Sequence, residues 1–374
     1  METIDDAREI LSDKVTETLR RDVEAGFEKL YAEGRCAGST GTASPMPPTL
    51  CRKPAPIRST IFTVKIGTPI HPEKSHDPRF RRLRRGPPHA QWPGDARIAV
   101  NFVINFEEGS ELSYPAGDGV SEGGLTEMLG TDLGVRGRDL AAESMFEYGA
   151  RVGFWRLHRI FTRFGLPVTI FGCAKAFEAN APVAAAIAAS DWDICSHGYR
   201  WTNHPGLSEA EEREQIAEAI ELIRRTTGKT PAGWYCRYAP SENTRRLLVE
   251  HGGFLYDSDT YNDELPYWVQ VNHRPHLVVP YSLTTNDSKF GRGVFGSGED
   301  FFAFLRDSFD VLYEEGAERP RMMSVGLHMR LTGHPGRAKA LIRFIQYIRG
   351  HPRVWICRRE DIARHWIDRF PPPN

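Results

Sequence analysis

The chain has 374 residues, with 48 lysines and arginines against 49 aspartates and glutamates, and its formal net charge at pH 7 is −1. An α/β barrel can accommodate most of this length, so one large domain with an extension is the expected organisation. The balanced charge gives no reason to expect a nucleic acid or an anionic membrane as a partner, and no stretch approaches the ~20 apolar residues of a membrane span. We therefore expect a soluble protein that acts on a small molecule.

Residues 1–35 are predicted to form an amphipathic helical arm. Residues 3–33 contain one glycine and no proline. Their apolar side chains are mostly spaced four apart, which places them on one face of a helix. A helix of this kind is marginal alone, so it is either an oligomerisation arm or a lid on the main domain. The apolar positions are Ile4, Ala7, Leu11, Val15, Leu19, Val23, Phe27 and Tyr31.

Residues 36–90 are predicted to be a linker or extended strap, because prolines interrupt any regular element there. Within it, the basic run from Arg79 to Arg85 could contact phosphates, but a solvated surface whose arginines pair with acids is the favoured interpretation. The prolines are Pro45, Pro47, Pro48, Pro54, Pro56, Pro69, Pro72, Pro78, Pro87 and Pro88.

The cysteines and the N-terminus both predict a cytoplasmic location. Residues Met1 to Asp6 are acidic and lack the apolar core of a secretion signal. The cysteines show no C-x-x-C pair, which favours reduced thiols over a disulfide framework. They are Cys36, Cys51, Cys173, Cys195, Cys236 and Cys357.

Residues 91–374 alternate apolar strands with amphipathic helices. This alternation predicts a parallel sheet, and about seven such units favour a distorted (β/α) barrel over an open sheet. The predicted strands are Ile98–Phe106, Val168–Gly172, Trp192–Cys195, Gly233–Tyr235, Leu277–Tyr281, Met322–His328 and Val354–Cys357. The predicted helices are Tyr148–Phe164, Pro182–Ala189, Ser208–Thr227, Asn243–His251, Gly298–Glu315, Arg337–Arg349 and Arg359–Phe370.

Several predicted strands end on residues that can carry chemistry. In a parallel barrel the carboxyl ends of the strands converge on one face. Two adjacent carboxylates are costly to bury unless the protein needs them there. We therefore expect one catalytic site made of Glu107, Glu108, His197, Arg237 and His328.

The motifs around these residues resemble those of the polysaccharide-deacetylase (NodB-homology) superfamily. Asn105-Phe106-Glu107-Glu108-Gly109 is similar to its T-F-D-D-G motif, and His197 begins a segment similar to its H-[S/T]-x-x-x-H-P motif. Arg237 to Pro240 is similar to R-x-P, and Leu327-His328 to the last motif. The resemblance runs from about Asp77 to the C-terminus and implies the distorted barrel of that family, a C–N hydrolase activity and homo-oligomerisation.

The resemblance is closer to the cofactor-independent allantoinases of that superfamily. In metal-dependent members one aspartate and two histidines hold a divalent cation such as zinc, but here the second histidine position is Trp201, which cannot coordinate a metal. The resemblance therefore implies a site without a cofactor. As an alternative, a bulged loop could bring His204 to Glu108 and His197 and restore a metal site.

Roles follow for a cyclic-amide substrate such as allantoin. Glu107 would take a proton from the attacking water, and Arg237 would hold Glu107 ionised through a bidentate pair. His328 would protonate the leaving ring nitrogen. Glu108 and His197 would bind substrate and orient the water, although His197 is alternatively a structural partner of Glu108.

Further residues are predicted to bind substrate. The aromatic side chains near the motifs are candidate pocket walls, with core packing as the competing explanation. An asparagine and an aspartate after a strand could bind a ureido group, with a turn as the competing explanation. Cys195 and Cys236 have no partnered base and are interpreted as buried thiols. The predicted binding residues are Tyr199, Trp201, Trp234, Tyr235, Asn286 and Asp287.

Three functions remain open from the sequence. The favoured one is metal-independent opening of allantoin to allantoate in purine degradation. The first alternative is a metal-dependent deacetylase of N-acetylated polysaccharides or chitooligosaccharides. The second is a non-catalytic binding barrel that uses residues 1–35 for interaction.

Overall fold

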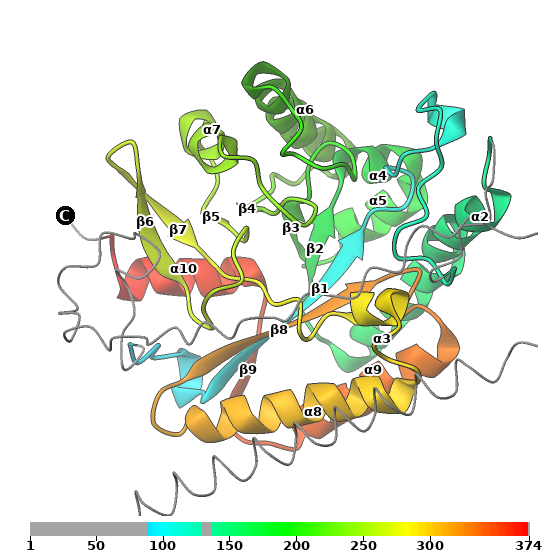
Figure 1. The fold of residues 1–374 in the computed structure, drawn as a ribbon. Coiled ribbons are helices and arrows are strands. Elements are labelled where there is room, and N and C mark those ends of the chain that lie inside the picture. The colour runs from blue at the N-terminus through cyan, green and yellow to red at the C-terminus, as the bar shows by residue number, and fades with distance from the viewer. Residues whose placement is uncertain (1–87, 129–136, 373–374) are drawn as a thin grey trace, which may run out of the picture. The chain divides into compact units, whose positions relative to one another are not determined.

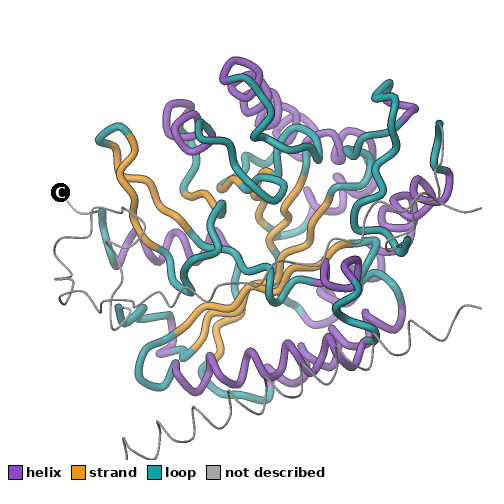
Figure 2. Tube along the Cα trace, viewed as in Figure 1, coloured by secondary structure: helices purple, strands orange, loops and turns teal. Residues whose placement is uncertain are grey.

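The structure is a computed structural model that describes residues 88–128 and 137–372. The predicted helical arm and nearly all of the predicted strap lie outside the described residues, so the domain boundaries stay a prediction. In the described part, a sheet of nine strands is surrounded by helices (Figures 1 and 2). No helix in the described ranges has both the length and the apolar character needed to span a bilayer.

The sheet is an α/β half-barrel of mostly parallel strands, as predicted. Its strand order is β6-β7-β5-β4-β3-β2-β1-β8, with β9 paired to the start of β1, and only the β6–β7 pair is antiparallel. The strands are β1 Ile98–Phe106, β2 Thr169–Gly172, β3 Asp193–Ser196, β4 Gly233–Trp234, β5 Tyr256–Asp257, β6 Tyr267–Val271, β7 Arg274–Val278, β8 Arg321–His328 and β9 Val354–Ile356.

The helices cover the outside of the sheet, and α8 and α9 lie side by side below it in Figure 1. A capping box begins α6, with Ser208 and Glu211 exchanging hydrogen bonds. The helices are α2 Leu140–Tyr148, α3 Phe154–Phe164, α4 Ala174–Ala179, α5 Ala181–Ala189, α6 Glu209–Thr227, α7 Thr244–His251, α8 Gly298–Glu315, α9 Pro335–Arg349 and α10 Arg359–Arg369. Short helical segments are η3 Pro93–Asp95, η4 Tyr114–Ala116, the π-helix η5 Gly149–Gly153 and η6 Asp287–Arg292.

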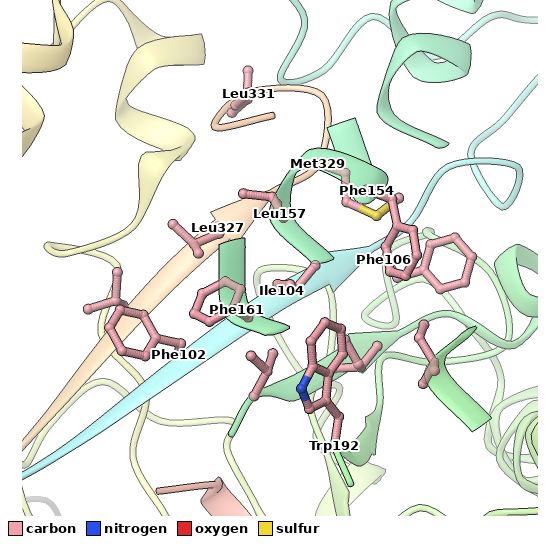
Figure 3. Packing of buried hydrophobic residues seen from close by; sticks show 14 of the residues in the cluster. Phe102, Ile104, Phe106, Phe154, Leu157, Phe161, Trp192, Leu327, Met329 and Leu331 are labelled. Atoms are coloured by element: carbon pink, nitrogen blue, oxygen red, sulfur yellow. The ribbon is translucent and has the colours of Figure 1, made fainter. Parts of the chain in front are cut away.

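Strand β1 is the centre of the fold, because all nine of its residues are buried. A strand buried on both faces has helices on one side and the barrel interior on the other. Phe102 and Phe106 of β1 pack with Phe154 and Phe161 of α3 in the larger apolar cluster (Figure 3). Val103 points to the opposite face of the strand, the barrel interior, and belongs to the second cluster. Burial on both faces holds the carboxyl end of β1 in place, and Glu107 and Glu108 follow directly after it.

Helix α4 was not predicted, and two further parts of the fold differ from the sequence prediction. Strands β5 and β6 were not predicted, because β5 has two residues and β6 forms a hairpin with β7. The predicted helix Tyr148–Phe164 is the second half of a longer helical run in which η5 joins α2 to α3. None of these differences moves the strand ends on which the predicted site depends.

Candidate active site

The carboxylate of Glu107 lies at the centre of the candidate site. The residue directly follows β1, and it is 1% exposed. Its Oε2 accepts a hydrogen bond from Arg330 Nη2 at 2.8 Å. Its Oε1 lies 3.4 Å from Nε2 of His197 and 3.4 Å from Nε2 of His328. One carboxylate oxygen is therefore held by a guanidinium, and the other faces two imidazoles.

Arg330 is a site residue that the sequence reasoning missed. It is 2% exposed, and its Nη1 donates to Glu108 Oε1 at 3.1 Å while its Nε donates to the carbonyl of Leu125 at 3.0 Å. The guanidinium carbon also lies 4.4 Å from the ring centroid of Phe146 and 4.9 Å from that of Trp201. Its position two residues after His328, beyond a predicted strand end, was the signal that could have found it.

The two acids of the site have pKa values shifted in opposite directions. Burial opposes ionisation of Glu107, but the positive charges of His328 and Arg330 outweigh burial and hold its pKa well below the usual value. Burial raises the pKa of Glu108, and the charge of Glu107 adds to this effect while Arg330 only partly offsets it. Opposite shifts in adjacent carboxyls are typical of sites that transfer protons.

His328 is held by Asp287, which is fully buried. Burial alone would lower the pKa of His328, but the charges of Glu107 and Asp287 raise it to about 9. Asp287 Oδ1 lies 2.6 Å from His328 Nδ1, and its Oδ2 accepts hydrogen bonds from the backbone N–H of His328 and from Thr332. The contact with Asp287 holds a proton on Nδ1 and points Nε2 at Glu107, and the charged imidazolium carries a proton on Nε2 as well.

His197 is oriented by Tyr235. Its Nδ1 lies 2.8 Å from the carbonyl oxygen of Tyr235, which can only accept, so this nitrogen carries the proton. The imidazole also stacks on the Tyr235 ring, with centroids 5.0 Å apart and planes inclined by 17°. The other ring nitrogen, Nε2, therefore faces the site, 3.4 Å from Glu107 Oε1.

The π-helix η5 brings the helical run against Glu108. A side chain at Gly149 would collide with the Glu108 carboxylate, and one at Gly153 would collide with the carbonyl of Met329. Only glycine at these positions allows so close an approach. The π-helical turn thus packs directly against the side chain of Glu108. Such turns are frequent at functional sites.

The predicted pairing of Arg237 with Glu107 is wrong. Arg237 instead pairs with Glu122 at 2.7 Å, donates to the carbonyl of Trp201 at 2.7 Å, and lies over the Trp201 ring at 3.7 Å. The physical reason is that Arg330 already occupies the carboxylate edge of Glu107. Arg237 therefore anchors the loop that follows β1.

The predicted ureido-binding pair is also corrected. Asn286 is 2% exposed, donates to the Tyr281 hydroxyl and caps η6 by accepting from the N–H of Ser288. Asp287 is 0% exposed, and its oxygens are engaged by His328 and Thr332. Both side chains are therefore internal, and Asp287 acts on the site through His328.

The predicted aromatic pocket walls lie at different depths. Trp201 is 1% exposed and packs against Arg330 and Arg237, so it backs the site. Trp234 is 0% exposed, donates its indole N–H to Cys236 Sγ and packs edge-on to His204, which fits the core-packing alternative. Tyr235 is 4% exposed and stacks on His197, whereas Tyr199 is half-buried against the main core.

The alternative metal ligands are not assembled into one group. His204 Nδ1 lies 3.0 Å from Glu212 Oε1, which engages it away from Glu108. The Arg330 guanidinium takes the space against both acids, and a cation there repels a metal ion. Across residues 88–128 and 137–372, no three His, Cys, Asp or Glu side chains are grouped so that they could hold a metal. These residues do not fit a divalent cation.

The two cysteines beside the motifs are buried thiols, as predicted. Both Cys195 and Cys236 are 0% exposed. Burial raises the pKa of each well above its usual value, which disfavours a thiolate nucleophile.

The fold and the site together define an α/β half-barrel with a carboxylate and imidazole centre at its strand ends. A family model described as polysaccharide deacetylase matches residues 137–255. A putative polysaccharide deacetylase of Schizosaccharomyces pombe is 38% identical over 301 residues, covering 75% of this chain and 93% of the relative. A peptidoglycan deacetylase of Helicobacter pylori is 30% identical over 287 residues, covering 68% and 96%. The chain belongs to the polysaccharide deacetylase family.

Two solved structures are also similar. The crystal structure of a probable polysaccharide deacetylase from Pseudomonas aeruginosa PAO1 has 51% sequence identity and a TM-score of 0.73, covering 77% of this chain and 96% of that chain. The crystal structure of PuuE allantoinase has 49% identity and a TM-score of 0.74, with the same two coverages of 77% and 96%. These similarities confirm the predicted family and half-barrel fold, and members of this family are carbon–nitrogen hydrolases.

Proposed function

We propose that the protein opens the hydantoin ring of allantoin to give allantoate, without a metal ion, as a step of purine degradation. The observation that carries the proposal is the arrangement around Glu107, where an ionised carboxylate meets His328 and the Arg330 guanidinium. The 49% identity with PuuE allantoinase supports this choice of substrate.

The chemistry is a general acid–base hydrolysis. The Glu107 carboxylate accepts a proton from water as the water oxygen attacks the ring carbonyl carbon. When the C–N bond breaks, the ring nitrogen takes the proton of His328 Nε2, and the pKa of about 9 keeps that proton in place at neutral pH. His197 orients the water through its Nε2, and Glu108 contributes to substrate binding.

The proposal of a metal-free site is supported by charge and by geometry. Arg330 already pairs with both acids, with 2.8 and 3.1 Å contacts. His204 is engaged by Glu212. To bind there, a divalent cation would therefore have to break the buried ion pairs of Arg330 and separate His204 from Glu212, and both changes are costly.

A second candidate is deacetylation of an N-acetylated sugar. It is favoured by the names of the relatives from Schizosaccharomyces pombe, Helicobacter pylori and Pseudomonas aeruginosa. An acetamide is also an amide, so the same base and acid would serve. The two candidates differ in the shape of the substrate rather than in the bond that is cleaved.

One assay separates the candidates. One sample of purified protein is left untreated, and a second is stripped of metal with a chelator that is then removed. Each sample is given allantoin or chitooligosaccharide in parallel, and allantoate and acetate are measured. We expect the two samples to form allantoate equally fast. Acetate release that needs added zinc, with no allantoate formed, would support the deacetylase instead.

We further propose that the protein is a cytoplasmic homo-oligomer. The scattered cysteines without a C-x-x-C pair motivate the location. The family resemblance motivates the homo-oligomer, to which the predicted amphipathic segment of residues 1–35 could add. Light scattering coupled to size-exclusion chromatography of the full chain and of a variant lacking residues 1–35 tests it. A monomeric mass for the full chain would contradict it.

A further inference from the structure

The guanidinium of Arg330 is buried, with hydrogen-bond acceptors at its edges and two aromatic rings beside it. Its side chain is 1% exposed. Carboxylates and a carbonyl bind its edges, and the rings of Phe146 and Trp201 lie 4.4 and 4.9 Å from its carbon. Cation–π contacts on a desolvated guanidinium fix its plane as well as its charge. The group is therefore pre-organised rather than free to turn.

The hydrogen-bond inventory shows what this guanidinium still offers. An arginine carries five N–H groups. Three are used by Glu107, Glu108 and the carbonyl of Leu125. Each of the two terminal nitrogens that contact the acids carries a second N–H group. These donors lie beside the carboxylate that faces His197 and His328.

Resting on the proposed function, we propose that Arg330 is the electrophilic catalytic group of the hydrolysis. Its second N–H groups donate to the oxygen of the substrate carbonyl and stabilise the negative charge that develops there. His328 cannot serve in this way throughout the reaction, because it gives up its proton to the leaving nitrogen. The guanidinium keeps its charge at every step.

The step balances without any further reactant. A bond forms between the water oxygen and the carbonyl carbon, the C=O π pair moves onto the oxygen beside Arg330, and one water proton passes to Glu107. The C=O bond then re-forms and the C–N bond breaks. Its electron pair stays on nitrogen, which takes the proton of His328. Arg330 exchanges no proton.

The test is chemical rescue of Arg330→Ala. We expect kcat to fall by about 10²–10³ and to recover at least about ten-fold, saturably, when guanidinium is added. Urea has the same shape without the charge and should not rescue. The matched control is Arg343→Ala. Arg343 also forms an ion pair, with Glu299, and its guanidinium carbon also lies near an aromatic ring, 4.0 Å from the centroid of Phe302, but its side chain is 39% exposed.

The outcomes that overturn the proposal are specific. They are an Arg330→Ala variant with kcat within about three-fold of wild type, equal rescue by urea and guanidinium, or a folded variant that guanidinium does not rescue. If Arg330→Ala does not fold, Arg330→Lys keeps the charge but loses the planar fork. Its kcat should fall at least about 30-fold, and an unchanged kcat overturns the proposal.

A second readout separates this proposal from the choice of substrate. Carbon-13 NMR of the glutamate carboxyls gives the pKa of Glu107 without any substrate, and it should rise in Arg330→Lys because the close guanidinium pair is lost. A wild-type protein that leaves allantoin intact refutes the proposed function alone. An active wild type whose variants fail the rescue test refutes the role of Arg330 alone.

Discussion

Two arginines of the described residues are buried, and their surroundings differ in kind. Arg330 is bound by the carboxylates of Glu107 and Glu108 at the strand ends. Arg359, the first residue of α10, is 0% exposed and donates to neutral oxygens inside the barrel. These acceptors are the side chains of Asn101, Ser258 and Ser324 and the carbonyls of Val279 and Pro280.

A buried guanidinium in this fold does not require carboxylates. Arg359 connects β1 and β8 to the segments that follow β5 and β7, across the side where β7 and β8 do not pair with each other. Neutral oxygens suffice for that structural task. The two acids around Arg330 are therefore present for a reason beyond satisfying a buried cation, and their opposite pKa shifts point to proton transfer.

The largest effect is expected from Arg359→Met. The substitution leaves several buried oxygens without a donor, at about 1–3 kcal/mol each. We expect the free energy of unfolding to fall by at least about 4 kcal/mol, measured by urea denaturation at pH 7. Arg343→Met on the surface should cost less than about 1 kcal/mol. An Arg359 variant as stable as wild type would contradict the structural role of Arg359.

Glu107→Gln should give Arg330 a neutral partner of the kind that Arg359 has. We expect the barrel to stay folded while turnover of allantoin falls by about 10²–10⁴, because the amide cannot accept the water proton. Turnover and circular dichroism are measured on the same sample, with Glu299→Gln as the surface control. Loss of the fold with this change would make the Arg330 pair structural, and retained turnover would assign the base elsewhere.

The part of the fold that local patterns determine could be predicted from the sequence. The apolar run of β1 was predicted with the bounds that the structure has, Ile98–Phe106. Strand β5 could not be predicted in this way, since its two residues gain strand geometry only by pairing with β4 and β7. Hydrophobic periodicity cannot indicate so short an element.

The predicted site divides in the same way. Glu107, His197 and His328 were found because each stands at the end of a recognisable strand, and the structure brings them within 3.4 Å contacts. Arg330 was missed because its partner Glu108 is 222 residues away and only the closed barrel joins them. Asp287 was assigned to substrate because its hydrogen bonds to His328 are likewise a product of tertiary structure.

Asp287→Asn tests the negative charge that contacts His328. Although burial lowers the pKa of His328, Glu107 and Asp287 raise it to about 9, so the imidazole is protonated below that pH and loses its proton above it. Wild-type kcat/KM should therefore fall above about pH 9. The variant lacks one negative charge, so the fall should begin at lower pH, with about ten-fold less activity at pH 8. An unmoved alkaline limb would show that His328 is not the acid.

The smallest effect is expected from Arg237→Ala, and it places a third arginine between the two extremes. Arg237 has one carboxylate partner, Glu122, and one carbonyl partner, and its side chain is 11% exposed. It therefore resembles Arg330 in pairing with a carboxylate. Its role is nevertheless structural, like that of Arg359, because it anchors the loop that follows β1. We expect kcat to change by less than about ten-fold, because Glu107 keeps its contact with Arg330. A loss as large as that of Arg330→Ala would mean that Arg237 reaches Glu107 during turnover, as the sequence alone had suggested.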